Sequence, residues 1–233
     1  MNARTALVTG ANRADGIGLA LLRELATRQP ERLVGTYRTV ESASALLDLA
    51  RADARVHAAM LDVTSDASVD GLAAWAGREV GALDLLVNNA GLGDGEGAIL
   101  RAALAELEAQ LQAHAIGMLR VTRALRPLLR RGSVVLNVSS TLGSIERMSG
   151  SWAFYSAAKA LQNALSRQLA AALRPDGVIV CAVSPGWVAT SMGSGGAPLT
   201  PEESAAHLVR LAERVTLADS GRFLEYDGTP LPW

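Results

Sequence analysis

Tyr155 and Lys159 stand four residues apart in a stretch with the apolar spacing of a helix. Residues four apart lie on one helix face, so the phenol and the amine can point into the same site. A free tyrosine has a pKa near about 10, too high for a base at neutral pH, and a nearby ammonium lowers that pKa by favouring the phenolate. The pair therefore indicates a proton donor and acceptor, although this spacing alone also arises by coincidence.

Lys159 is the only lysine among the 22 basic residues of the chain, and all the others are arginine. A codon bias toward arginine accounts for the arginines but not for the surviving lysine. Lysine is a compact point charge that can also donate hydrogen bonds to a ribose, so the two side chains are not interchangeable here. The composition therefore favours a chemical requirement for lysine at this position.

Two serines, Ser139 and Ser140, follow the apolar run that precedes the helix of Tyr155. A hydroxyl there could hold a substrate carbonyl and stabilise the negative charge that develops on its oxygen. Serines at such positions also serve as helix caps or turn formers. Because they lie at the end of a predicted strand, directly ahead of the helix with the Tyr–Lys pair, we favour a functional role for one of them.

A glycine-rich loop lies between the first predicted strand and the first predicted helix. Glycine permits a tight turn there, lets the backbone approach a pyrophosphate, and lets the helix pack close to the strand. The helix N-terminus offers unpaired N–H groups and a partial positive charge to the phosphates. We therefore predict a dinucleotide site with contacts from Gly10, Asn12, Arg13, Gly16, Ile17 and Gly18.

Arg38 follows the second predicted strand, at the place where an NAD-binding protein usually has an acid for the ribose hydroxyl. A carboxylate there would repel a 2′-phosphate, whereas an arginine pairs with it. Arg13 could add a second positive charge from the glycine loop. We predict NADP(H) rather than NAD(H) as the cofactor; the alternative is that Arg38 is one more surface arginine.

Short apolar runs alternate with longer amphipathic stretches along the chain. The runs are apolar almost throughout, as in strands covered on both faces, and the alternation predicts a parallel sheet with right-handed crossovers. We predict a single domain over residues 1–233 with an α/β, Rossmann-type, doubly wound sheet of about seven strands in three layers. The predicted strands are Thr5–Thr9, Leu33–Tyr37, Val56–Leu61, Leu83–Asn88, Ser133–Ser139, Val178–Ser184 and Phe223–Tyr226, and the predicted helices are Ile17–Thr27, Glu41–Ala50, Ala67–Arg78, Ala102–Leu129, Trp152–Leu173 and Pro201–Val215.

Composition narrows the classes of partner. The net charge of the 233 residues is −1 and no long basic run appears, which argues against nucleic-acid binding. The single cysteine, Cys181, excludes an internal disulfide and a cysteine-rich metal site, and its apolar surroundings indicate a buried structural thiol. No run approaches the about 20 apolar residues of a membrane span, and no targeting segment is visible. We expect a cytoplasmic protein without a metal and without a membrane or nucleic-acid partner.

In this order, the motifs resemble those of the short-chain dehydrogenase/reductase family, over nearly the whole chain. The resemblance implies that Ser140, Tyr155 and Lys159 are the catalytic residues. It also implies cofactor contacts outside the glycine loop. These are Asp62 and Val63 near the adenine, Asn89, Ala90 and Gly91 after the fourth strand, Tyr155 and Lys159 themselves, and Pro185, Gly186, Val188 and Thr190 around the nicotinamide.

Residues 186–193 and 220–228 carry a closer similarity to the C-factor and sniffer-like branch of carbonyl reductases. That branch contains carbonyl reductases and proteins linked to cell signalling, so it does not name a substrate. The resemblance implies a small carbonyl or alcohol substrate. By analogy it also implies a homodimer or homotetramer that pairs through the two long helices predicted at 102–129 and 152–173.

The glycine loop departs from the family pattern. Five residues separate Gly10 from Gly16, so Ala14 and Asp15 read as an insertion. Because a carboxylate beside a pyrophosphate is unfavourable, we expect Asp15 to point to solvent. The insertion leaves the contacts of Asn12 and Arg13 open.

His114 is the second departure, since it occupies the position at which many members carry an asparagine that keeps a water in the proton relay. A histidine can relay protons itself because its pKa lies near neutrality. The equally weighted alternative is that His114 packs inside its helix without a role.

The expected function is hydride transfer to or from a carbonyl carbon, with Tyr155 as general acid and base. Residues 191–200, rich in Gly, Ser and Pro, are expected to form a mobile lid over the site. Two alternatives stay open: a redox sensor that binds NADP(H) with little turnover, and an enzyme of the same fold that catalyses epimerisation or dehydration.

Overall fold

The computed structural model describes residues 3–93, 99–150, 152–192 and 196–233. Its central element is a seven-stranded sheet in the order β3-β2-β1-β4-β5-β6-β7, in which every pair of neighbouring strands is parallel. The order reverses between β1 and β4, as in a doubly wound sheet, so the predicted fold class is confirmed. The strands are β1 (Thr5–Val8), β2 (Arg32–Tyr37), β3 (Val56–Met60), β4 (Leu83–Asn88), β5 (Leu129–Val138), β6 (Ile179–Ser184) and β7 (Phe223–Glu225).

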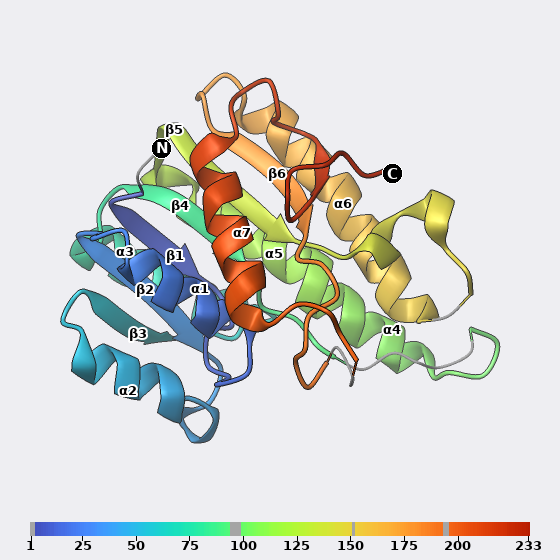
Figure 1. Cartoon of the computed structure of the whole chain (residues 1–233), viewed down its shortest axis with the longest axis horizontal. Helices are drawn as coiled ribbons and strands as arrows, with labels where there is room; N and C mark the ends of the chain where they lie inside the picture. Colours follow the sequence, from blue (N-terminus) through green and yellow to red (C-terminus); the bar gives the residue numbers. More distant parts are fainter. Residues whose placement is uncertain (1–2, 94–98, 151, 193–195) are drawn as a thin grey trace.

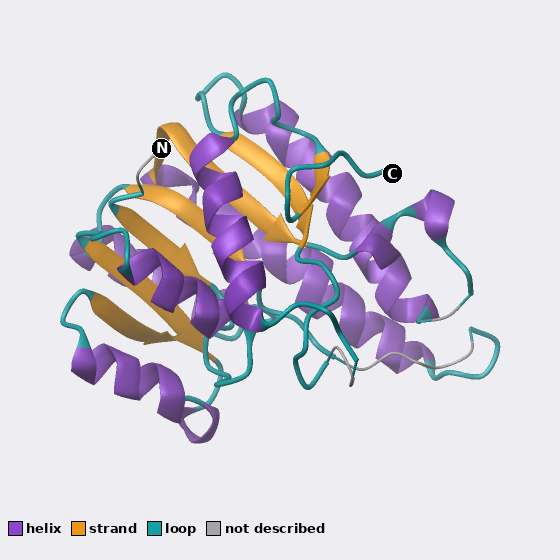
Figure 2. Ribbon diagram, viewed as in Figure 1, coloured by secondary structure: helices purple, strands orange, loops and turns teal. Residues whose placement is uncertain are grey.

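Helices cover both faces of the sheet, as Figures 1 and 2 show. They are α1 (Ile17–Ala26), α2 (Ser44–Ala52), α3 (Asp66–Glu79), α4 (Leu104–Gln110), α5 (Gly117–Leu125), α6 (Ala153–Leu173) and α7 (Pro201–Arg214). One apolar cluster joins α1, α2 and α7 to the first face, and a second joins α3, α5 and α6 to the other. The apolar side chains of β1, β4, β5 and β6 alternate between the two clusters, which explains why these strands read as continuously apolar runs.

The long helix predicted over 102–129 is helical from Leu104 to Leu128, but it is not α-helical throughout. After α4 the backbone passes through a π-helical segment at Leu111–Ile116, then through α5, and ends in a short 3-10 turn at Arg126–Leu128. Pro127 lies in that turn, and a proline lacks the N–H that would continue the helix. The strand β5 therefore begins at Leu129, four residues before the predicted start, and pairs with β4 across a register shift.

The second predicted helix also starts later than expected. Residues Val40–Ser42 form a 3-10 turn, and α2 begins at Ser44 rather than at Glu41. The Ser42 hydroxyl donates to the backbone oxygen of Thr39 at 2.9 Å, so a local side-chain bond stabilises the turn in place of a first α-helical turn.

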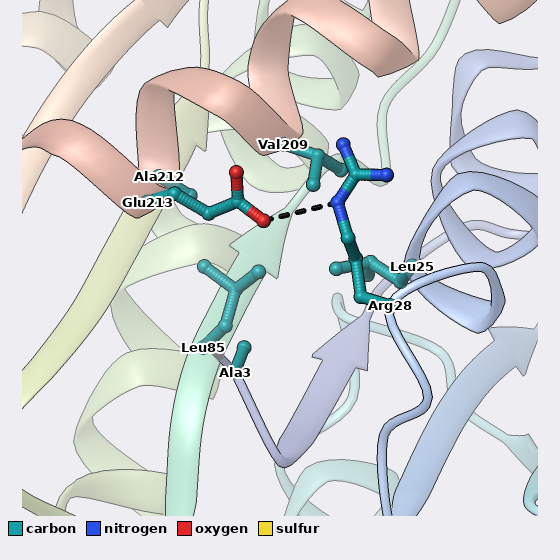
Figure 3. Close-up of a pocket in the computed structure, with 7 residues that line it drawn as sticks. All are labelled: Ala3, Leu25, Arg28, Leu85, Val209, Ala212 and Glu213. Atoms are coloured by element: carbon teal, nitrogen blue, oxygen red, sulfur yellow. Dashed lines mark hydrogen bonds and ion pairs between the residues drawn. The ribbon is translucent and has the colours of Figure 1, made fainter. Parts of the chain in front are cut away.

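A small hole lies where α1 and α7 meet above β4, close to the start of β1 (Figure 3). It holds about 10 Å³, which is room for a single water and not for a substrate. The Arg28 guanidinium closes it by pairing with Glu213 of α7 at 3.1 Å. The hole is therefore a small gap in the packing next to an ion pair, and it is not a substrate site.

Within the described ranges, no helix has both the length and the apolar character needed to cross a membrane.

Candidate active site

A cleft of about 1070 Å³ opens beyond the carboxyl ends of the central strands, at the reversal of strand order. Open α/β sheets bind their ligands at this position, because the loops there diverge to either side. Every residue that the sequence predicts for the site lines this cleft. These are Gly10, Asn12, Arg13, Gly16, Ile17, Gly18, Arg38, Asp62, Val63, Asn89, Ala90, Gly91, His114, Ser140, Tyr155, Lys159, Pro185, Gly186, Val188 and Thr190.

The glycine loop packs so tightly that side chains are excluded. A Cβ on Gly18 would lie 2.5 Å from the carbonyl oxygen of Gly10, which no real side chain tolerates. Asn89, which follows β4, stabilises the same turn. Its Nδ2 donates to the backbone oxygens of Thr9 at 2.9 Å and Gly10 at 3.0 Å. The structure thus gives Asn89 the role of holding the loop in shape at the start of α1.

Asp15 is exposed, as expected, but its carboxylate is also hydrogen-bonded to two neighbours. Its Oδ2 accepts the backbone N–H of Ser191 at 3.0 Å, and its Oδ1 accepts from Arg13 at 3.4 Å. Arg13 also donates to the Ser191 hydroxyl. Both side chains remain about half exposed, at 50% for Arg13 and 49% for Asp15. The inserted residues therefore tie the glycine loop to the segment after β6, and the Arg13 guanidinium is directed there.

The segment predicted as a lid is partly folded. Val188 and Leu199 form a parallel bridge, and the N–H of Ala189 donates to the oxygen of Leu199 at 2.8 Å. Thr200 then caps α7 in a capping box with Glu203. Residues 193–195, in the middle of the predicted lid, lie outside the described residues.

Arg38 and Asp62 lie at the far end of the cleft, after β2 and β3. Thr64 donates two hydrogen bonds to the Asp62 carboxylate, one from its hydroxyl at 2.7 Å and one from its backbone N–H at 2.9 Å. The hydroxyl bond is the main reason why the pKa of Asp62 lies below its ordinary value. The positive charges of Arg38 and Arg120 add to this lowering. A charged carboxylate and an exposed guanidinium therefore face this end.

Both serines line the cleft, but it is Ser140 whose hydroxyl is bonded to Tyr155. Ser139 is buried and its hydroxyl donates to Asn163 at 2.6 Å. Ser140 accepts the N–H of Leu142 at 3.2 Å and shares a hydrogen bond with the Tyr155 hydroxyl. The structure therefore brings Ser140, the serine that the resemblance implies, to Tyr155, and turns the Ser139 hydroxyl to Asn163.

Tyr155 and Lys159 lie one turn apart on α6, with the Lys159 Nζ 5.6 Å from the centre of the Tyr155 ring. Burial raises the pKa of Tyr155 to about 12, and the bond from Ser140 offsets part of that rise. Burial lowers the pKa of Lys159 to about 7. The expected lowering of the tyrosine pKa is thus wrong for the chain alone, because removal from water dominates and the bond to Ser140 offsets only part of it.

His114 sits in the π-helical segment, 2% exposed, with the edge of its ring against Tyr155 at 5.2 Å between centroids. Its Nε2 lies 3.1 Å from the N of Leu92 and 3.0 Å from the oxygen of Leu92. A Cβ on Gly91 would lie 2.2 Å from the ring, so only glycine fits there. Burial, reinforced by the charge of Lys159, holds the pKa of His114 well below its usual range. His114 is therefore neutral at neutral pH, and its Nδ1 finds no hydrogen-bond partner among the described residues.

This neutrality gives a testable expectation for the three histidines of the chain. In a proton NMR titration between pH 5.5 and 8, the ring signal of His114 should show no titration of its own near pH 6.5, because burial lowers its folded pKa well below that value. The signal is assigned by its loss in His114→Asn. A signal that disappears in this variant but titrates near pH 6.5 in the wild-type protein would contradict the assignment of a neutral ring.

The structure adds residues in and beside the cleft that sequence reasoning missed. The ring of Trp152 packs edge-on with that of Tyr155 at 6.2 Å between centroids, and Trp187 and Met192 line the same cleft, with Trp187 55% exposed. Gln162, one turn after Lys159, is buried against the lysine. The sequence did offer signals for these residues. Trp152 and Trp187 lie next to predicted motifs, and Gln162 is a polar residue on the apolar side of a helix.

Comparison with known proteins gives a consistent result. The family model described as short chain dehydrogenase matches residues 4–197. The C-signal protein of Myxococcus xanthus is 35% identical over 156 residues, which is 66% of this chain and 94% of that protein.

Solved structures with nearly full coverage agree. The carbonyl reductase Sniffer of Drosophila melanogaster superimposes with a TM-score of 0.93 at 31% identity, covering 99% of each chain. The NADPH-bound carbonyl reductase from chicken fatty liver superimposes with a TM-score of 0.94 at 30% identity, covering 100% of each chain. The resemblance read from residues 186–193 and 220–228 is therefore confirmed at the level of the branch.

Proposed function

Because this chain belongs to the short-chain dehydrogenase/reductase family, we propose that it is an NADP(H)-dependent reductase of small carbonyl compounds. The observation that carries the proposal is the meeting of three groups in one cleft: the bonded hydroxyls of Ser140 and Tyr155, and the amine of Lys159. Reduction of a carbonyl needs a positioned proton donor and a hydrogen-bond donor to the carbonyl oxygen, and these groups can supply both.

The cleft fits a dinucleotide phosphate. The turn at Gly10 and Gly18 leaves no space for a Cβ, so backbone N–H groups at the start of α1 can approach a pyrophosphate. Arg38 at the end of β2 supplies a positive charge where a 2′-phosphate would lie. The NADPH of the chicken carbonyl reductase supports the same cofactor here. When bound, NADPH supplies the hydride.

The chain's own residues would handle the oxygen and its proton. Ser140 and Tyr155 hold the carbonyl oxygen of the substrate, and Tyr155 gives it a proton as the carbon is reduced. Burial raises the pKa of Tyr155 to about 12, so the phenol is protonated at neutral pH and holds the proton to be donated. Lys159 presents its N–H groups to the cofactor ribose.

The rim of the cleft favours an uncharged substrate. Trp152 packs on Tyr155, and Trp187 and Met192 add further apolar surface to the lining of the same cleft. The charged side chains that line the described cleft are Arg13, Arg38 and Asp62, at the predicted nucleotide end, and the buried Lys159. Small aldehydes, ketones and diones match these surroundings.

The test follows the absorbance of NADPH while a panel of aldehydes, ketones and diones is added. Consumption of NADPH with formation of the alcohol supports the reductase. Tight NADPH binding without consumption would support a redox sensor instead, and conversion of substrate without net oxidation of NADPH would support an epimerase or dehydratase.

A further inference from the structure

Gln162 is a buried amide on α6, 2% exposed, three residues after Lys159. A buried amide needs partners for its oxygen and its nitrogen, because an unpaired polar group in the interior destabilises the fold. Gln162 Nε2 donates to the carbonyl oxygen of Val138 at 3.2 Å, and Gln162 Oε1 accepts from Lys159 Nζ at 2.9 Å. Both partners line the cleft.

Lys159 closes the same set of bonds. Its Nζ also donates to the carbonyl oxygen of Val138, at 2.8 Å, so the lysine, the glutamine and the last residue of β5 form a ring of three hydrogen bonds. An ammonium has three N–H donors, and this ring uses two of them. The third is left for the cleft that Lys159 lines. Without the ring, a lysine stem of four carbons would have several rotamers available.

We propose that Gln162 is a positioning residue: its amide, anchored on the Val138 carbonyl, holds the Lys159 ammonium beside Tyr155 and leaves one N–H for the cofactor ribose. The inference rests on the proposed function for its catalytic meaning. The hydrogen-bonded arrangement itself is a property of the chain and can be tested without turnover.

Among the residues that the structure describes, few ionisable groups lie around Lys159. Tyr155 faces it from α6 itself, and His114 faces it from the π-helical segment packed on α6. Among the other elements that pack on α6, the turn Thr141–Gly143 has no ionisable side chain, and the Glu106 and Glu108 side chains of α4 are exposed. Cys181 of β6 belongs to the apolar cluster on the opposite face of the sheet. A change confined to Gln162 therefore leaves all other charges near Lys159 in place.

The single lysine of the chain makes a direct measurement available. In protein labelled with lysine carrying 13C at Cε, one side-chain signal reports the titration of Lys159, with an expected midpoint of about 7 in the wild type. Gln162→Met keeps the length of the side chain and removes the acceptor. The hydrogen bond favours the ammonium form, so its loss should lower the midpoint by about one pH unit. Gln162→Glu should raise the midpoint, because a carboxylate stabilises the ammonium.

Ser166→Ala is the matched control, since Ser166 is buried one turn further along α6 and bonds to Asn137 and the Gln162 backbone but not to Lys159. Its lysine midpoint should equal that of the wild type. Gln162→Met should also weaken NADPH binding by about tenfold, because the Lys159 ammonium would no longer be held in place to donate a hydrogen bond to the ribose. A lysine midpoint that is identical in Gln162→Met, Gln162→Glu and the wild type would overturn the proposal.

The outcome is separable from that of the proposed function. A protein that shifts its lysine midpoint as described but consumes no NADPH with any carbonyl would reject the reductase and keep the role of Gln162 in holding Lys159. A protein that reduces carbonyls with an unshifted midpoint in both variants would keep the reductase and reject Gln162 as its positioning residue.

Discussion

Tyr155→Phe should reduce kcat for carbonyl reduction by about a hundredfold to ten thousandfold, the range that a positioned general acid contributes. The substitution keeps the ring, and with it the edge contact to His114 at 5.2 Å, so the fold and the shape of the cleft should persist. It removes the hydroxyl that bonds to Ser140 and would protonate the substrate oxygen. The measurement is the steady-state rate of NADPH oxidation with the best substrate of the panel.

The Kd for NADPH, measured by quenching of protein fluorescence, should change little in this variant, because the effect lies in chemistry rather than in binding. Tyr226→Phe is the matched control, since Tyr226 loses the same hydroxyl but packs on His207 outside the cleft. Near-normal kcat in Tyr155→Phe would reject Tyr155 as the proton donor.

Arg38→Ala should weaken NADPH binding by about tenfold to a hundredfold and leave NADH binding nearly unchanged. The expected loss corresponds to one charge-assisted hydrogen bond, roughly 1.5–3 kcal/mol, between the guanidinium and the 2′-phosphate. Arg38 lines the cleft after β2, next to Asp62, so its removal also leaves that carboxylate to repel the phosphate. The measurement is the Kd of each cofactor at low and at high salt; the preference for NADPH should weaken as salt screens the pair.

Arg51→Ala serves as the control, because this exposed arginine pairs with Asp48 on α2 and does not line the cleft. An Arg38→Ala protein with an unaltered ratio of the two dissociation constants would show that Arg38 is a surface arginine. If Arg13→Ala then abolished the preference, the charge would come from the glycine loop in spite of its bonds to Asp15 and Ser191.

The chemical parts of the site could be predicted from the sequence because they depend on local order. The glycine loop must follow the first strand, and the pair Tyr155 and Lys159 needs only helical spacing to share a face. Parallel strands then bring their carboxyl ends to one edge, so the residues that follow them line one cleft. The apolar runs and their alternation with helices likewise determined the doubly wound sheet.

The tertiary structure decided what depends on neighbours distant in the sequence. Burial, which no local pattern measures, reversed the expected pKa shift of Tyr155 and left His114 neutral. The contact of Asp15 with Ser191 joins residues 176 positions apart. Gln162 gained its role only when β5 placed the Val138 carbonyl beside α6. Spacing along the chain determines which side chains share a face, whereas their charge and their partners depend on what the fold packs against them.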